Sequence, residues 1–100
     1  MAYKFHSDAG HGWLAVKVAE LYRLGIEYKI SQFSYIKGKT AYLEEDCDLS
    51  LFLRTKKERG ETVEIVEGKP QKYSPVRSYN CYTAGRASIV LAHNHTKVAA

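Results

Sequence analysis

Three side chains that can bind a metal ion fall within six residues near the start of the chain. His6, Asp8 and His11 stand in a segment whose glycines and aspartate predict a turn. Imidazole nitrogens and carboxylate oxygens are ligands of zinc and related ions. Histidines on a turn also commonly form local hydrogen bonds only, so a metal site is one of two interpretations. His93 and His95 near the C-terminus could complete such a site.

Four carboxylates are concentrated in residues 44–48. Glu44 and Asp46 occupy alternate positions, and alternate residues of a strand share a face, so this pair could act as an acid and a base or hold a divalent cation. The segment lacks the oxygen pattern and central glycine of an EF-hand. Asp46 or Asp48 could instead cap a following helix, because a carboxylate accepts hydrogen bonds from orphan backbone N–H groups. We favour the cap, with the other acids in solvent.

Tyrosines and basic residues are interleaved in the C-terminal third of the chain. This set comprises Lys72, Tyr73, Arg77, Tyr79, Tyr82 and Arg86. Tyrosine and arginine provide large, rigid contacts with polar tips at interfaces. They also stack on nucleic-acid bases while nearby cations hold phosphates. Tyrosine equally suits a strand, yet we predict that this set contacts a macromolecule, a protein rather than a nucleic acid.

The sequence lacks the motifs of common catalytic classes. It contains no Ser-His-Asp order, no P-loop, no Rossmann glycine pattern and no CxxC. Cys47 and Cys81 match no zinc spacing, and we expect both to be small buried hydrophobes in a reducing compartment. We therefore expect a protein without enzymatic activity and without a cofactor.

Composition predicts one soluble domain. The 100 residues carry a formal net charge of +4, with 45% hydrophobic and 26% charged residues, as is typical of globular chains. We expect residues 1–83 to form the compact part and residues 84–100 to add a strand or a loose tail. No apolar run approaches the about 20 residues that span a bilayer, and the N-terminus lacks the apolar core of a signal peptide. The expected location is the cytoplasm, with no membrane partner.

Hydrophobic periodicity predicts two helices and several strands. The helices are expected at 17–24 and 49–59, and the strands at 3–6, 13–16, 33–36, 40–44, 62–67 and 87–92, with 76–83 extended. Gly25, Gly38 and Gly60 suit a helix end, a hairpin turn and a second helix end. Lys56 should extend the apolar stripe of its helix with its stem while its head stays in solvent, and Ile65 should lie on the buried face of its strand.

The order strand, helix, strand, strand, helix, strand over residues 13–67 matches the split βαβ pattern. Two amphipathic helices can cover one face of a sheet and bury their apolar stripes there. We predict an α+β fold with a single antiparallel sheet, two helices on one face and a possible ferredoxin-like core with extra edge strands.

Three segments resemble parts of one protein family. They read KFHSDAGHGWLAV at 4–16, SYIKGKTAYLEEDCD at 34–48 and SPVRSY at 74–79. Together they are similar to a family of small uncharacterised proteins of bacterial phages, prophages and plasmids, over roughly residues 3–82. The resemblance carries over no activity and no catalytic or binding residues. The resemblance implies a compact accessory protein that binds a host or defence component, as anti-CRISPR proteins do.

The leading hypothesis is a non-enzymatic binding protein of phage or mobile-element origin that docks on a host or defence macromolecule. One alternative is a nucleic-acid-binding protein that uses the basic and aromatic C-terminal third. The other is a metal-dependent enzyme or a metal-stabilised domain built on His6, Asp8 and His11, with Glu44 or Asp46.

Overall fold

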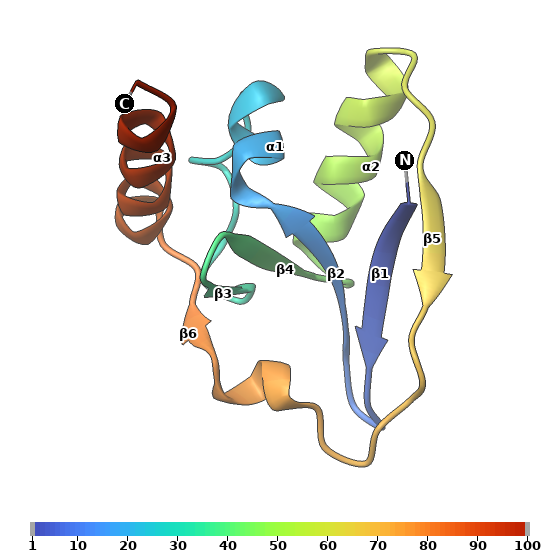
Figure 1. Cartoon of the computed structure of the whole chain (residues 1–100). Coiled ribbons are helices and arrows are strands. Elements are labelled where there is room, and N and C mark those ends of the chain that lie inside the picture. The colour runs from blue at the N-terminus through green and yellow to red at the C-terminus, as the bar shows by residue number, and fades with distance from the viewer. Residues whose placement is uncertain (1, 100) are drawn as a thin grey trace.

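A computed structural model describes the backbone of residues 2–99 and the side chains of residues 2–93. Within this range the chain forms one mixed sheet of six strands and three α-helices, an α+β arrangement (Figure 1). The elements in chain order are β1 (Ala2–Ser7), β2 (Gly12–Lys17), α1 (Val18–Arg23), β3 (Tyr35–Lys37), β4 (Thr40–Glu44), α2 (Asp48–Glu58), β5 (Glu64–Glu67), the 3₁₀-helix η1 (Pro75–Ser78), β6 (Asn80–Cys81) and α3 (Ala84–Ala99).

Two β–α–β crossovers build the sheet, whose strand order is β5-β1-β2-β4-β3-β6. The first crossover runs from β2 through α1 to β3, and β4 lies between these two strands and pairs antiparallel with both. The second runs from β4 through α2 to β5, and β2 and β1 lie between these two strands. The predicted α+β class and first split βαβ unit are confirmed. The sheet is mixed rather than antiparallel, because β5 pairs in parallel with β1. A ferredoxin-like core stays a prediction.

The hydrophobic core lies between one face of the sheet and the helices. Leu14 of β2 stands opposite Leu43 of β4, and both are fully buried. Phe52 of α2 packs edge-on against Tyr3 of β1, with ring centroids 5.2 Å apart. All three helices contribute buried side chains to this cluster, so the sheet has three covering helices where the sequence predicted two.

The opposite face of the sheet carries aromatic side chains. Trp13 of β2 and Tyr35 of β3 meet at 6.1 Å between ring centroids. Tyr42 of β4 contacts Tyr79, which follows η1, at 5.1 Å. Because side chains alternate across a strand, these rings lie away from the helices. The segment around η1 therefore covers the second face of the sheet.

Local predictions for the first two helices hold, but the cap of α2 differs. Gly25, Gly38 and Gly60 all have positive φ angles, as their turns require. The N-cap position of α2 is occupied by Cys47, which makes no side-chain capping bond. The Asp48 carboxylate instead accepts hydrogen bonds from the Ser31 backbone nitrogen at 3.1 Å and hydroxyl at 2.7 Å. The predicted cap by Asp46 or Asp48 is therefore wrong.

The C-terminal segment is a helix, and neither the strand predicted at 87–92 nor the loose tail after it is present in residues 84–99. The Thr83 hydroxyl accepts a hydrogen bond from the Arg86 backbone nitrogen at 3.0 Å, which satisfies one orphan donor of the first turn. Ala87, Val90 and Leu91 pack against the core at helical spacing. No helix within residues 2–99 has the length and apolarity to cross a membrane.

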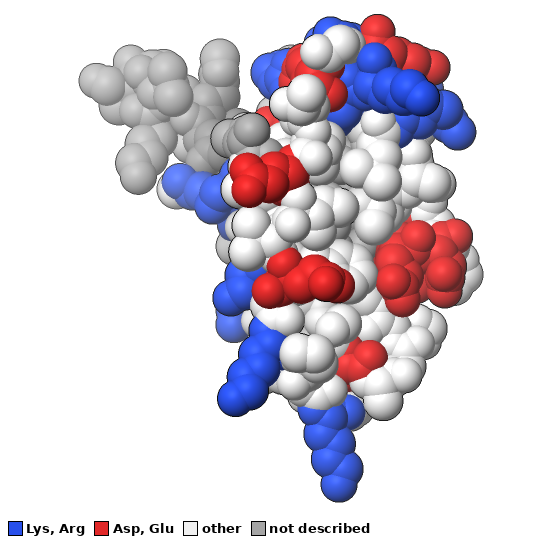
Figure 2. All heavy atoms as spheres, turned by 90° about the vertical axis from the view of Figure 1, so that its right-hand side faces the viewer, with Lys and Arg blue, Asp and Glu red and all other residues white. Residues whose placement is uncertain are grey.

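Strand β5 forms one edge of the sheet and is exposed along its whole length. Ile65 and Val66 point to opposite faces and are 42% and 49% exposed. The predicted strand is present, but Ile65 is exposed, so the predicted burial of this side chain is wrong. Figure 2 shows this side of the molecule, with acidic side chains across its middle, basic and acidic ones together at its top and basic ones at its bottom.

Lys56 is buried, contrary to the expectation of a solvated head. Its Nζ lies 3.1 Å from Glu20 and 2.9 Å from Glu61, and Arg23 contacts Glu61 at 2.7 Å. Burial opposes its charge, but hydrogen bonds with Glu61, Tyr3 and Glu20 raise the pKa of Lys56 above its usual value. Hydrogen bonds from Arg23 and then Lys56 lower the pKa of Glu61 to about 2. The cluster ties α1 to the end of α2.

Replacing a buried and an exposed phenylalanine by alanine should change the free energy of unfolding by very different amounts. Phe52→Ala removes a fully buried ring and should lower the free energy of unfolding by about 3–5 kcal/mol. Phe33→Ala, at a side chain that is 67% exposed, should change it by about 0.5 kcal/mol or less. Urea denaturation measures both, and equal effects would contradict the described core.

Acid should weaken the Lys56 cluster. Glu61 has a folded pKa of about 2 against an ordinary 4.5, so it stabilises the fold fully above pH 4.5 and progressively less as the pH falls towards 2. The free energy of unfolding, measured by urea denaturation in this range, should fall less steeply for Glu61→Gln than for the wild type. Glu58→Gln, at an exposed residue of α2, is the control and should retain the wild-type slope.

Candidate functional site

The six residues predicted to contact a partner have different environments. Tyr82 is fully buried and its hydroxyl donates to the Glu27 carbonyl at 2.5 Å. It is a core residue, so its prediction as a contact residue is wrong. Tyr73 is 69% exposed, and Lys72 beside it is also exposed. Both remain accessible to a partner.

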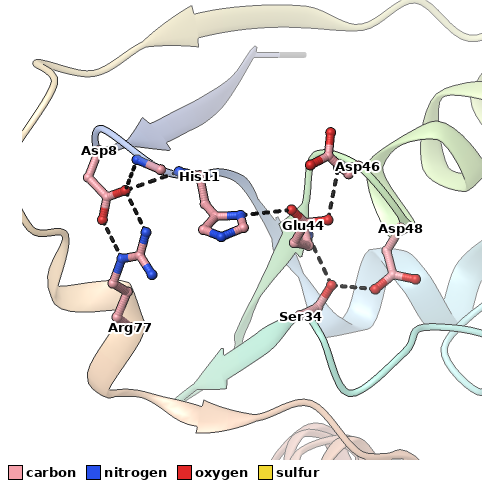
Figure 3. A network of polar contacts seen from close by, with 8 residues as sticks. Asp8, His11, Ser34, Glu44, Asp46, Asp48 and Arg77 are labelled. Atoms are coloured by element: carbon pink, nitrogen blue, oxygen red, sulfur yellow. Dashed lines mark hydrogen bonds and ion pairs between the residues drawn. The ribbon is translucent and has the colours of Figure 1, made fainter.

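Asp8 and Arg77 form an ion pair between the β1–β2 turn and η1 (Figure 3). Arg77 donates through Nε at 2.6 Å and Nη2 at 2.8 Å. The backbone nitrogens of Ser74, Gly10 and His11 donate to the same carboxylate at 3.0, 3.0 and 3.1 Å. Hydrogen bonds from Arg77 and then Ser74 hold the pKa of Asp8 far below its usual range. Asp8 is therefore a structural anchor and is not available as a metal ligand.

The Arg77 guanidinium lies close to two aromatic rings. Its central carbon is 5.4 Å from the centroid of the Trp13 ring and 5.5 Å from that of Tyr73. These distances are within the range of cation–π attraction. The ion pair and the two rings together hold the η1 segment against the aromatic face of the sheet.

Tyr79 and Arg86 line a hollow of about 490 Å³ at the β6 edge, which we call the α3–β3 hollow. Its lining consists of Ile36, Lys37, Gly38, Ser78, Tyr79, Asn80, Arg86, Ile89 and Val90. This set contains two bases and no acid. Ile89 is 72% exposed, so a large apolar side chain stands in solvent beside the two cations.

Both cations of the α3–β3 hollow are oriented by neighbours. The Lys37 ammonium lies 4.6 Å from the centroid of the Tyr79 ring. Arg86 donates through Nη1 to the carbonyl of Cys81 at 3.0 Å. Arginine carries five N–H donors. Among residues 2–93, both hydrogen bonds of the Arg86 side chain are made by Nη1, so its Nε and Nη2 groups can donate to a partner. Sequence reasoning missed Lys37 and Ile89, although helical spacing from Arg86 would have indicated Ile89.

A second hollow, of about 340 Å³, lies at the end of β4, and we call it the β1–β4 hollow. It is lined by His11, Trp13, Phe33, Tyr35, Glu44, Asp46, Cys47 and Arg77. His11 Nδ1 lies 3.4 Å from Glu44 Oε1, and Glu44 Oε2 accepts from the Asp46 backbone nitrogen at 2.8 Å. Figure 3 shows these three residues beside the Asp8–Arg77 pair.

Only part of the predicted metal-binding set comes together. His11, Glu44 and Asp46 meet, whereas His6 packs against Tyr42 with ring centroids 5.6 Å apart. His93 lies on α3, and the side chain of His95 is outside the described residues. The turn therefore supplies one histidine, and the acidic segment supplies the two carboxylates.

Neither cysteine is buried, contrary to expectation. Cys47 is exposed, Cys81 is half-buried, and both are free thiols. Desolvation, with a hydrogen bond to Glu44 and the charges of Asp48 and Asp46, raises the pKa of the Cys47 thiol. The acidic surroundings thus disfavour a thiolate nucleophile at this position.

Comparison with protein-family models, with curated proteins and with solved structures finds no match for this chain. The resemblance to proteins of mobile elements therefore stays a prediction.

Replacing Arg77 by lysine should test the anchor. Arg77→Lys keeps the charge, but an ammonium group cannot donate in a fork to both oxygens of Asp8. We expect a lower Tm and altered fluorescence of Trp13, the single tryptophan of the chain. Arg54→Lys, on the exposed side of α2, should change neither quantity. Wild-type Tm and emission in Arg77→Lys would show that the pair does not anchor η1.

Proposed function

We propose that this protein is a non-enzymatic binding protein that docks on an acidic protein surface through the α3–β3 hollow. The observation that carries the proposal is the combination of Lys37, Arg86 and exposed Ile89 around a hollow whose lining contains no carboxylate. A cationic rim with an apolar anchor complements a partner segment that presents acidic and apolar side chains.

The charge at the start of α3 supports a binding role. Helices favour acidic residues in their first turn, because the N-terminal end of the helix dipole is positive. The first turn of α3 contains no acid and carries Arg86 instead. This arrangement weakens the helix slightly and adds to the positive potential at the hollow. Departures from local stability rules are expected where a surface serves binding.

The aromatic wall of the hollow is already ordered. Tyr79 packs against Tyr42 on one side and lies under the Lys37 ammonium on the other. A side chain held before binding loses little conformational entropy when the partner arrives. Tyr79 thus has the features of a preorganised contact residue, as does Arg86 with its Nη1 held by Cys81.

The lining of the α3–β3 hollow favours binding over turnover. It contains no histidine, aspartate or glutamate that could act as a general base. Its single hydroxyl side chain besides Tyr79 is Ser78, which donates to the Pro75 carbonyl at 2.8 Å. The resemblance to accessory proteins of mobile elements favours a host or defence protein as the partner.

A nucleic acid is the second candidate partner, because Lys37 and Arg86 could each contact a phosphate. Each neutralised phosphate of duplex DNA adds about −0.9 to the slope of log K against log salt. Two bases therefore give a slope of about −2, shallow for a protein whose function is nucleic-acid binding. The apolar wall formed by Ile36, Ile89 and Val90 also suits a protein better than a phosphate backbone.

Charge and shape changes in the α3–β3 hollow should weaken capture of the partner. Wild-type protein and the variants Arg86→Glu and Ile89→Asp are immobilised and exposed to a nuclease-treated bacterial lysate that contains defence systems. Both residues are exposed, so the variants should keep the wild-type Tm within a few degrees. We expect the wild type to retain a protein whose affinity falls at least about tenfold in each variant, as at an interface hot spot.

Matched controls carry the same changes elsewhere. Lys57→Glu alters an exposed base of α2, and Ile65→Asp alters an exposed isoleucine of β5, at the other edge of the sheet. Both should retain the partner. Equal capture by all five proteins would contradict the proposal. Capture from an untreated lysate but not from the nuclease-treated one, with a salt slope steeper than about −4 on duplex or single-stranded probes, would favour the nucleic-acid alternative.

A further inference from the structure

The β1–β4 hollow brings one histidine and two carboxylates together from separate parts of the chain. His11 belongs to the β1–β2 turn, Glu44 ends β4, and Asp46 follows it. One possible ligand atom from each lies within 4.8 Å of the others. The backbone sets this meeting, because Trp13 pairs with Glu44 in the sheet and the Glu45 nitrogen donates to the Gly12 carbonyl at 3.0 Å.

Two buried polar atoms at this hollow lack a hydrogen-bond partner among the described residues. They are Trp13 Nε1 and Glu44 Oε1, whose 3.4 Å contact with His11 Nδ1 is not a hydrogen bond. Both residues line the β1–β4 hollow. The Glu44 side chain is only 9% exposed. A buried carboxylate oxygen without a donor is costly unless a cation or a polar ligand compensates it. An orphan acceptor and an orphan donor in one hollow indicate a missing polar occupant.

We propose that His11, Glu44 and Asp46 bind one divalent metal ion of the zinc class in the β1–β4 hollow. The ion would neutralise the two carboxylates and supply the partner that Glu44 Oε1 lacks. A nitrogen ligand beside two carboxylates favours zinc-class ions over Mg²⁺ or Ca²⁺, which prefer all-oxygen sites. The site is separate from the α3–β3 hollow and does not depend on the proposed function.

One of the three ligand pairs already has the spacing of a zinc site. Ligand atoms about 2.0–2.1 Å from a tetrahedral zinc ion lie about 3.3–3.4 Å from each other. His11 Nδ1 and Glu44 Oε1 are already 3.4 Å apart. Asp46 is exposed and the His11 side chain is 47% exposed, so these two can adjust without disturbing the core. Three protein ligands leave one position for water.

The consequence of binding would be a further link between the β1–β2 turn and the elbow after β4. At present these segments are joined at this end by the His11–Glu44 contact and the backbone bond from Glu45 to Gly12. A metal ion bound in the folded state alone stabilises that state by mass action. The Trp13 ring, whose centroid is 6.1 Å from that of His11, is close enough for its fluorescence to report the event.

Titration of the full chain with Zn²⁺ tests the proposal. Metal-free protein at pH 7.5 is titrated with ZnCl₂ while calorimetry gives the stoichiometry and Trp13 emission gives an independent curve. We expect one ion per chain, a rise in Tm, and no response to Mg²⁺ or Ca²⁺ at the same concentrations. His11→Gln, Glu44→Gln and Asp46→Asn should each weaken Zn²⁺ binding at least about tenfold. His11→Gln and Asp46→Asn change exposed groups and keep the test valid if Glu44→Gln fails to fold.

The matched controls are His6→Gln and Glu45→Gln, which remove the neighbouring histidine and the neighbouring carboxylate outside the cluster. Both should bind Zn²⁺ as the wild type does. An absence of heat, of a Tm rise and of a fluorescence change up to 1 mM Zn²⁺ would show that His11 and Glu44 form a simple ion pair and would overturn the proposal. Wild-type affinity in His11→Gln and Asp46→Asn would overturn it too, because the ion would then bind elsewhere.

Discussion

The carboxylate of Asp8 is the point on which the second half of the structure depends. It accepts hydrogen bonds from three backbone nitrogens and two guanidinium nitrogens. Ser74 and Arg77 are 66 and 69 positions away in the sequence. A nearly buried charge is tolerated here because its acceptor sites are satisfied by donors. The β1–β2 turn is thereby joined to η1, and η1 leads directly into β6 and α3, which form the α3–β3 hollow.

Both faces of the central strands are covered, and this explains why Tyr35 and Tyr42 are partly buried and where both hollows lie. The helices cover the aliphatic face, and the segment around η1 covers the aromatic face. Tyr35 and Tyr42 suit that second face, because an aromatic ring can pack on a neighbour while its hydroxyl reaches solvent. Surfaces for binding remain at the margins of the sheet, with the α3–β3 hollow at the β6 edge and the β1–β4 hollow at the end of β4.

Neighbouring charges have opposite roles because tertiary contacts differ. Arg77 is neutralised by Asp8 and lies close to two aromatic rings, whereas Arg86 lines a hollow without an acid. Both are basic residues of one short segment, and nothing in their local sequence separates them. The same holds for Lys56, whose position on an apolar stripe predicted a solvated head but whose partners Glu20 and Glu61 enclose it. Charge patterning therefore predicted a basic region correctly but did not predict which charge is available to a partner.

Local patterns in the amino-acid sequence determined the hairpin around Gly38, the helices α1 and α2, and the strands on either side of these helices. These elements could be predicted because turn glycines and apolar periodicity act over only a few residues. The apolar run at 87–92 fits a strand or a helix, and the packing of α3 on the core decided between them. Tertiary structure alone decided the parallel pairing of β5 with β1, the Asp8–Arg77 anchor and the meeting of His11 with Glu44 and Asp46. These contacts join residues far apart along the chain, and a contact of that kind depends on the packing of the whole molecule rather than on the preference of any one segment.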